Sequence, residues 1–266
     1  LPTSLFLQRL SDIIRQFVQE NDSFYNIEQG DVLPVLSTNK LSSQSQEEYQ
    51  TQDQQHAVDA ILKVVHGHRR RPLVLSADRG RGKSASLGIA AAQLVAEGKQ
   101  TILVTAPSLT IADTVFKHAA SLLPDGIVSR GLISWNNTEI RFIAPDELIN
   151  SDLKADCVLV DEAAAIPTSM LEKILAQYSR LVFATTLHGY EGTGRGFTVR
   201  FQQILEQQTP NWHHQKMSQP IRWSEGDSLE AFSFQALLLD AEPVVDELIA
   251  DAQIDSCEFE QIDRQQ

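Results

Sequence analysis

Short apolar runs alternate with amphipathic stretches through the middle of the chain. Five runs have the length and composition of buried strands, at residues 73–77, 101–106, 140–144, 157–160 and 181–185. The stretches between them favour helices; the segment after Ser108, for example, carries Ile111 and Val115 on one face. Strands that alternate with helices predict an α/β fold, in which helices cover both faces of a mainly parallel sheet.

The two ends of the chain lack this alternation. Apolar residues recur at helical spacing between Leu7 and Phe17, which predicts a short N-terminal helical segment. Residues 37–55 are rich in Ser, Gln, Thr and Glu, a composition typical of a linker or an exposed loop. Beyond Gln207 the pattern is irregular, apart from a predicted helix at Leu229–Leu239. We therefore expect an N-terminal segment at residues 1–36 and a linker at 37–50. A compact domain with an irregular C-terminal extension would span 51–240, and a solvated acidic tail 241–266.

Composition and charge narrow the class of protein. A hydrophobic content of 42% and a charged content of 21% are ordinary for a soluble globular protein, and no apolar run is long enough to cross a membrane. The formal net charge of −13 argues against binding nucleic acid through bulk charge, so such a contact would need a local basic patch or a further domain. Cys157 and Cys257 lie far apart and no Cys/His spacing resembles a zinc site, which favours a reduced, cytoplasmic protein.

The stretch ADRGRGKS, residues 77–84, is close to the phosphate-binding pattern G-x-x-x-x-G-K-[ST]. Alanine replaces the first glycine, where a small residue at the end of a strand suffices, and Gly80 and Gly82 still give the backbone freedom. Backbone N–H groups and the start of the following helix would hold phosphates. Lys83 would reach the β and γ oxygens, and the Ser84 hydroxyl would bind Mg²⁺. The alternative is a glycine-rich turn that carries GKS by chance.

An acidic pair directly follows the apolar run at 157–160. Asp161 at the tip of that strand would lie beside Mg²⁺, so it is predicted to be a metal ligand together with Ser84. Glu162 is not needed for the metal and can polarise the attacking water, as in proteins that hydrolyse ATP. The alternative role of the pair is to cap a helix that begins near Pro167.

Two further features follow. The run at 181–185 ends in hydroxyls, and Thr185 or Thr186 would sense the γ-phosphate if this strand lies between the two motif strands, although threonine is common in strands.

The stretch GYEGTGRGF, residues 189–197, predicts a flexible loop that holds Arg195, whose guanidinium suits the charge on a γ-phosphate or an RNA phosphate. A surface loop with an incidental arginine is the alternative. An acetyl-coenzyme A loop is rejected, because glutamate occupies the place of the required Gln or Arg.

Several polar residues near the phosphate loop are further candidates for ligand contacts. Gln54 could read an adenine edge, because its amide offers a donor and an acceptor together, although a polar linker end explains it nearly as well. Arg79 and Arg81 make the phosphate loop unusually basic. The cluster HGHRRR at residues 66–71 could touch nucleic acid, but a solvated loop is the simpler interpretation.

Taken together, ADRGRGKSA, VDEAAAIP, ATT and GYEGTGRGF resemble the tRNA(Met) cytidine acetyltransferases, which join an RNA-helicase-like ATPase module to an acetyltransferase domain. The resemblance covers roughly residues 50–240 and implies a RecA-like P-loop NTPase fold, with residues 1–36 as the end of an N-terminal domain. The predicted catalytic residues are Lys83, Glu162 and Arg195. The residues predicted to bind ATP with Mg²⁺ are Gln54, Gly80, Arg81, Gly82, Lys83, Ser84, Ala85, Asp161, Thr185 and Arg195.

The same resemblance implies a function in ATP-dependent formation of N4-acetylcytidine at the wobble position of elongator tRNA(Met). tRNA would be a partner, and acetyl-CoA would bind to an acetyltransferase domain of the same parent chain. We expect that domain to be missing here, because no acetyl-CoA loop occurs in these residues. Two alternatives stay open: a docking module that binds nucleotide without hydrolysing it, and a DNA-directed P-loop ATPase of another family.

Overall fold

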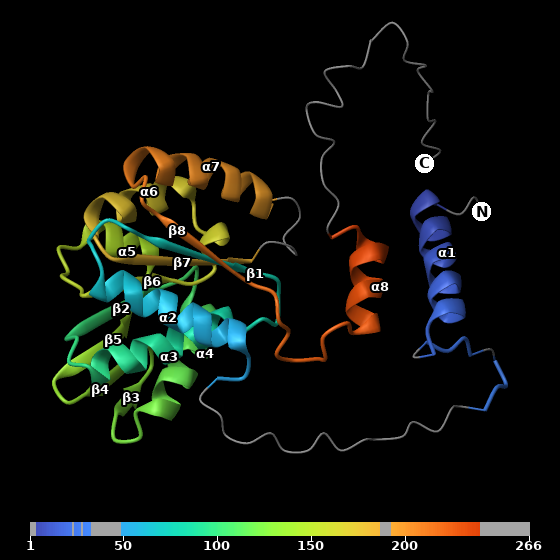
Figure 1. Ribbon diagram of the computed structural model, residues 1–266, viewed down its shortest axis with the longest axis horizontal. Coiled ribbons are helices and arrows are strands. Elements are labelled where there is room, and N and C mark those ends of the chain that lie inside the picture. Colours follow the sequence, from blue (N-terminus) through green and yellow to red (C-terminus); the bar gives the residue numbers. More distant parts are fainter. Residues whose placement is uncertain (1–3, 23, 28, 33–48, 187–192, 240–266) are drawn as a thin grey trace, which may run out of the picture. The chain divides into compact units, whose positions relative to one another are not determined.

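The computed structural model describes residues 4–22, 24–27, 29–32, 49–186 and 193–239, which fall into two compact units (Figure 1). One unit joins the chain up to Asn26 with the chain from Ser228 onward, and the other spans Ile27–Asp227. The domain boundaries expected from the sequence stay a prediction.

Two helices build the smaller unit, α1 (Leu5–Glu20) and α8 (Ser228–Leu237). The Ser4 hydroxyl caps α1 by accepting a hydrogen bond from the first turn. The Phe17 ring packs edge-on against Phe232 of α8, with 5.3 Å between the ring centroids. The helical segments expected at both ends of the chain are therefore present.

A twisted sheet forms the centre of the larger unit. The described residues contribute eight strands, which lie across the sheet in the order β3 (Ile127–Ser129), β4 (Leu132–Trp135), β5 (Thr138–Phe142), β2 (Thr101–Thr105), β6 (Cys157–Val160), β7 (Leu181–Thr186), β1 (Leu73–Ala77) and β8 (His213–Met217). The strands from β5 to β8 in this order run parallel, whereas β3, β4 and β5 pair antiparallel. Parallel strands place all their carboxyl ends at one edge, where the motif residues gather.

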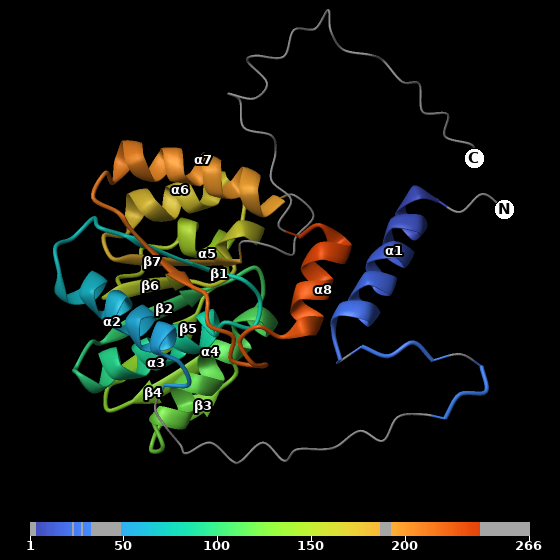
Figure 2. The same ribbon diagram turned by 45° about the vertical axis from the view of Figure 1, so that its right-hand side comes forward.

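Helices cover both faces of this sheet (Figures 1 and 2). One face packs on α2 (Gln52–His66), α3 (Lys83–Ala96) and α4 (Leu109–Leu122), and the other on α5 (Pro145–Asn150), α6 (Thr168–Gln177) and α7 (Thr193–Gln208). Two buried cores result because each central strand sends side chains to both faces; in β2, Ile102 faces the first core and Leu103 the second. The predicted α/β fold is confirmed.

The strands that carry the motifs lie where the sequence predicts them, and the differences fall toward the margins of the sheet. The strand expected at 140–144 is β5, which starts two residues sooner because Asn136 and Asn137 form a tight turn with positive φ just before it. The apolar pattern does not predict β3, β4 or β8. β8 reads HHQKM and lies at the edge of the sheet beside β1, so its exposed side chains need not be apolar.

Two segments expected to be loops are helical, at least in part. Residues 52–55 are the first turn of α2 rather than linker, and the Thr51 hydroxyl caps that turn by accepting from the Gln54 N–H at 3.1 Å. Thr193 begins α7, so Arg195 lies on a helix and not on a flexible loop; residues 33–48 and 187–192 lie outside the described residues. In α2 and α7 the first turn is polar, so the apolar pattern of the sequence does not show where either helix begins.

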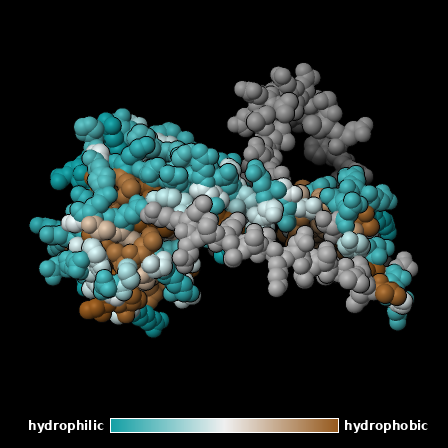
Figure 3. Space-filling model, turned by 60° about the horizontal axis from the view of Figure 1, so that its bottom comes forward, coloured by the Kyte–Doolittle hydropathy of each residue, from teal (hydrophilic) through white to brown (hydrophobic). Residues whose placement is uncertain are grey.

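The surface of the larger unit is apolar at one edge of the sheet. Figure 3 shows apolar side chains gathered on the face that carries this edge, where Ile127 and Val128 of β3 are exposed. Among the described residues, no helix combines the length and the apolar character that crossing a bilayer would require.

Candidate nucleotide-binding site

A glycine loop joins the end of β1 to the start of α3. Ala77 closes the strand and is fully buried, in keeping with a small residue at that position. Gly80 and Gly82 have φ of +79° and +87°, a left-handed backbone that favours glycine. Gly82 is also the N-cap of α3 and supplies no side-chain cap, so the first N–H groups of the helix remain available to an anion.

Lys83 is buried in the first turn of α3. Its Nζ donates to the carbonyl oxygens of Ala77 and Asp78, at 3.3 and 3.4 Å. Burial lowers the pKa of Lys83, and the nearby carboxylates of Glu162 and Asp161 oppose that change by favouring the charged amine. The loop thus places a partly desolvated cation where a phosphate would lie.

Asp161 follows β6 and is almost completely buried. Its Oδ1 accepts from the Glu162 N–H at 3.0 Å, whereas its Oδ2 has no hydrogen-bond partner in the described structure. Burial raises the pKa of Asp161 to about 6, and the Ser84 hydroxyl beside it opposes the rise. An unsatisfied buried carboxylate oxygen is costly, and it indicates a ligand position.

Glu162 is held in an unusual backbone conformation, with φ of +52°. Such strain in a residue other than glycine is often found at functional sites. Its Oε2 accepts from the Thr186 hydroxyl at 3.2 Å, and its Oε1 is buried with no hydrogen-bond partner in the described structure. One oxygen is thus fixed while the other stays available.

β7 lies between β6 and β1, as the sequence predicts for an ATPase with an inserted strand. Thr186 pairs in register with Ala77 and lines the cavity beside Glu162. Thr185, the neighbouring residue on the strand, is not among the lining residues, and its hydroxyl is buried with no partner in the described structure. Of the two threonines, Thr186 therefore contacts the acidic pair, and a role for Thr185 stays a prediction.

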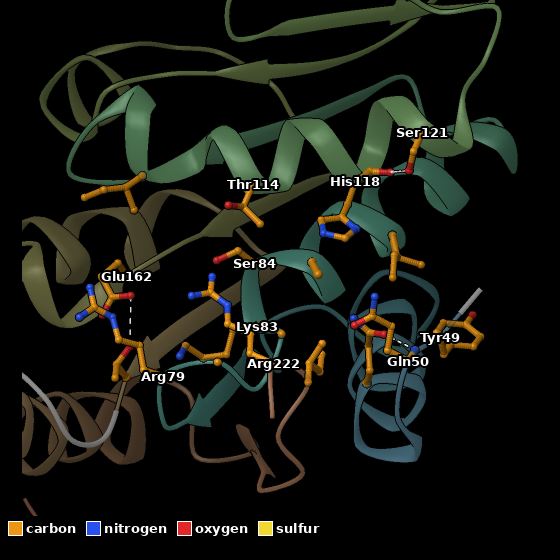
Figure 4. Close-up of a pocket in the computed structure, with 18 of the residues that line it drawn as sticks. Tyr49, Gln50, Arg79, Lys83, Ser84, Thr114, His118, Ser121, Glu162 and Arg222 are labelled. Carbon is orange, nitrogen blue, oxygen red and sulfur yellow. Dashed lines mark hydrogen bonds between the residues drawn. The ribbon is translucent and has the colours of Figure 1, made fainter. Parts of the chain in front are cut away.

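The loop glycines, Lys83, Glu162 and Thr186 line one cavity of about 1250 Å³ (Figure 4). Glu162 and Arg79 lie at one end of it, Lys83 and Ser84 lie near the middle, and α4 forms a long wall. Tyr49 and Gln50 lie at the other end. The remaining lining residues include Gln54, Gly80, Gly82, Ala85, Ile89, Thr114, His118, Ser121, Thr186, Ile221 and Arg222.

Gln54 lies against the phosphate loop, where a Cβ added to Gly82 would be 3.3 Å from its Nε2. Its Oε1 accepts from the Gln50 N–H at 2.8 Å, so that oxygen is already engaged. The amide therefore lies at the cavity as predicted, but adenine reading by both of its groups at once would require this bond to break.

The predicted arginines have different positions. Arg79 lines the cavity, whereas Arg81 is buried with its guanidinium 5.6 Å from the centroid of the Trp223 ring. The structure describes only the backbone of Arg195, so its predicted role is not tested. Sequence reasoning missed Tyr49, which lay in the expected linker, and His118, because no motif marks α4.

The residues present fit a magnesium ion bound together with a nucleotide. The Asp161 Oδ2 lacks a partner and the Ser84 hydroxyl lies near it, and hard oxygen donors are those that Mg²⁺ prefers. Within the described part of the chain, no three His, Cys, Asp or Glu side chains gather as a metal site. The ion would therefore take its other ligands from phosphate and water.

Comparison with known proteins decides the family. The model described as "RNA cytidine acetyltransferase NAT10/TcmA, helicase domain" matches residues 74–240. This chain belongs to that family. The resemblance seen in the motifs is therefore confirmed for the helicase-like region.

The family includes proteins much longer than this chain. The tRNA(Met) cytidine acetyltransferase TmcA of Nitrosococcus halophilus is 46% identical over 98% of this chain, and the match covers 36% of that protein. Those of Vibrio cholerae and Haloferax volcanii are 44% and 39% identical over 79% and 83% of this chain, and each match covers 30% of the relative. The chain thus spans about a third of the length of these relatives.

A solved structure supports the fold assignment. The large terminase from a thermophilic bacteriophage matches with a TM-score of 0.51 and 14% identity, over 69% of this chain and 49% of that chain. At this identity the likeness shows the fold alone, an α/β fold of the RecA-like kind.

Gly80→Ala in this helicase domain is expected to lower the free energy of unfolding by more than the strain of its positive φ alone would. A Cβ there would lie 2.7 Å from Cη2 of Trp223, so overpacking adds about 1–3 kcal/mol to the strain of positive φ. Gly98→Ala is the matched control, because Gly98 has φ of +93° with nothing within 4 Å of an added Cβ. Urea denaturation of both variants measures the difference, and equal losses would contradict the contact with Trp223.

Asp161→Asn is expected to stabilise the chain at pH 8. Raising the pKa of Asp161 from 3.8 to about 6 corresponds to a cost of about 3 kcal/mol at most for keeping the buried group charged. Above pH 6 the carboxylate is ionised in both states and that cost is present; below pH 6 the folded state gains a proton and the cost fades. Urea denaturation should show a gain at pH 8 that shrinks by pH 5, and a gain that grows at low pH would contradict the buried charge.

Proposed function

We propose that this chain binds ATP with Mg²⁺ and hydrolyses it, as the nucleotide-dependent module of an RNA cytidine acetyltransferase. The observation that carries the proposal is the pair of unsatisfied carboxylate oxygens, Asp161 Oδ2 and Glu162 Oε1, beside the buried amine of Lys83. One of two neighbouring carboxylates can bind a metal ion while the other orients a water, provided that the two lie in different surroundings.

Each group has one role in this proposal. Lys83 and the first N–H groups of α3 bind the phosphates, and Ser84 with Asp161 holds Mg²⁺. The ion would neutralise charge on the phosphate oxygens. Glu162 orients the attacking water through Oε1, because Thr186 holds its other oxygen at 3.2 Å. Arg195, on the first turn of α7, is proposed to stabilise the transferred charge.

The energy of hydrolysis would serve RNA modification. Relatives are named tRNA(Met) cytidine acetyltransferases, so we propose that the module supports N4-acetylcytidine formation at the wobble position of elongator tRNA(Met). We propose that hydrolysis repositions the tRNA for this modification. Acetyl-CoA would bind to an acetyltransferase domain of the parent protein.

Phosphate release by the purified chain tests this proposal. Hydrolysis should require Mg²⁺, disappear with EDTA and rise when elongator tRNA(Met) is added. Nucleotide binding without hydrolysis in the presence of tRNA would instead favour a docking module. Stimulation by duplex DNA but not by tRNA would assign the chain to DNA-directed ATPases.

A further inference from the structure

Three consecutive arginines, residues 69–71, precede β1 at the edge of the sheet opposite to the phosphate loop. All three are exposed, and the sequence carries no acidic residue between Asp59 and Asp78. Because β1 and β7 run parallel, the segment that precedes β7 lies at the same edge and brings Arg180 beside them. The amino-edge patch is defined here as five side chains: His68, Arg69, Arg70, Arg71 and Arg180.

Hydrogen bonds fix the backbone that carries the patch. The Arg70 N–H donates to the Ser179 carbonyl oxygen at 2.8 Å, and the Arg180 Nη2 donates to the Gly67 carbonyl oxygen at 3.4 Å. Arg70 has φ of +60°, an uncommon conformation for a residue other than glycine. The segments before β1 and β7 are thus joined in both directions. A backbone that is already ordered lowers the entropy cost of binding a ligand.

The positive charge of the patch is not neutralised within the described part of the chain. None of its arginines forms an ion pair with a described carboxylate. Two carboxylates in neighbouring segments have other partners: Glu97 lies 2.8 Å from the His66 Nε2, and the Asp156 Oδ2 accepts from two backbone N–H groups at 2.7 and 3.2 Å. The Arg180 Nε is buried and has no hydrogen-bond partner in the described structure. The patch therefore offers an anion several cations and an unsatisfied donor, in a chain whose formal net charge is −13.

We propose that the amino-edge patch binds the phosphate backbone of a folded RNA, and that this RNA is the tRNA on which the module acts. The identity of the RNA rests on the proposed function. A guanidinium fork donates two hydrogen bonds at once to phosphate oxygens, and successive phosphates along a strand match a run of arginines. The patch contains no apolar side chain, whereas protein partners gain most of their affinity from apolar and aromatic anchors. Binding by charge alone is typical of a nucleic-acid backbone.

The position of the patch separates RNA binding from nucleotide binding. The phosphate loop follows the carboxyl end of β1, and the three arginines precede its amino end. The five residues of β1, at about 3.3 Å each, place the loop and the patch about 15 Å or more apart. RNA bound at the patch would leave the cavity open to ATP. Loss of the patch is therefore expected to leave ATP affinity unchanged.

The test replaces the three arginines together, as Arg69→Gln, Arg70→Gln and Arg71→Gln in one chain. Fluorescence anisotropy measures the affinity for elongator tRNA(Met) over a range of salt concentrations. Each phosphate contact contributes about 0.7–0.9 to the slope of log affinity against log salt, so the slope should fall by about 2–3. Affinity should fall at least about 10-fold at about 0.1 M salt, because each lost contact removes part of the counterion release.

A second triple variant is the matched control, because it removes the same net charge from exposed cations outside the patch. Its substitutions are Lys117→Gln, Arg130→Gln and Lys173→Gln. The control should keep the tRNA affinity and most of the salt dependence of the unchanged chain. Melting temperatures of both variants without RNA show whether they fold. ATP affinity provides a further measurement, which neither variant should change.

The outcomes separate this inference from the proposed function. If the unchanged chain binds tRNA and the patch variant keeps both affinity and slope, only the patch is overturned. An equal loss in the control variant also overturns it, because net charge would then explain the binding. Patch-dependent binding of polyglutamate but not of tRNA overturns it by assigning the patch to an acidic protein. Patch-dependent tRNA binding by a chain that hydrolyses no ATP supports the patch and overturns the proposed hydrolysis alone.

Discussion

Glu162→Gln is expected to lower ATP hydrolysis about 10²- to 10⁴-fold while ATP binding is retained. The amide keeps the size of the side chain and can still bond to Thr186, but it cannot accept a proton from water. A catalytic base that is removed without changing shape lowers kcat and leaves affinity nearly unchanged. Phosphate release and nucleotide affinity, measured on the same protein in the presence of tRNA, check this prediction.

Glu147→Gln is the matched control for that experiment. Glu147 is exposed on α5 and lies outside the lining of the cavity, so its replacement removes the same charge elsewhere. The role of Glu162 would be disproved by unchanged turnover in its variant. An equal fall in both variants would point to net charge rather than to an oriented water.

Lys83→Ala is expected to abolish hydrolysis by a different route, through lost phosphate binding. The amine is buried next to the loop and its pKa is lowered by burial, so phosphate contact restores the interactions that desolvation removed. ATP affinity should fall at least about 10- to 100-fold, which is the magnitude for a charge-assisted contact in a partly buried site. Fluorescence competition with a labelled nucleotide measures this loss.

Lys154→Ala provides the comparison, because Lys154 is exposed and is not among the residues that line the cavity. The melting temperature of the Lys83 variant without nucleotide shows whether it folds, because removing the amine ends a desolvation cost but also leaves Asp161 and Glu162 without a nearby cation. Unchanged ATP affinity after Lys83→Ala would contradict the phosphate loop itself. It would also leave the positive φ of Gly80 and Gly82 without a functional reason.

The sheet and the motif order could be predicted because both depend on local patterns. A strand that is buried on both faces is mainly apolar, which marks β1, β2, β6 and β7 in the sequence. The motif residues follow such strands directly, so the parallel arrangement brings Asp161 and the phosphate loop to one edge. Edge strands and the polar first turns of α2 and α7 escaped prediction, since they are not constrained by full burial.

The sequence by itself determined the fold class, the phosphate loop, the acidic pair and the family. Only the tertiary structure decided which neighbours surround them: Thr186 beside Glu162, Gln54 against Gly82, and the segment after β8, residues 218–223, against Gly80. The physical reason is the range of the interactions. Strand burial and loop glycines are dictated over a few adjacent residues. The hydrogen bonds from Ser218 and Gln219 to Asp53 instead join residues that lie 165 and 166 positions apart, and they leave no local pattern.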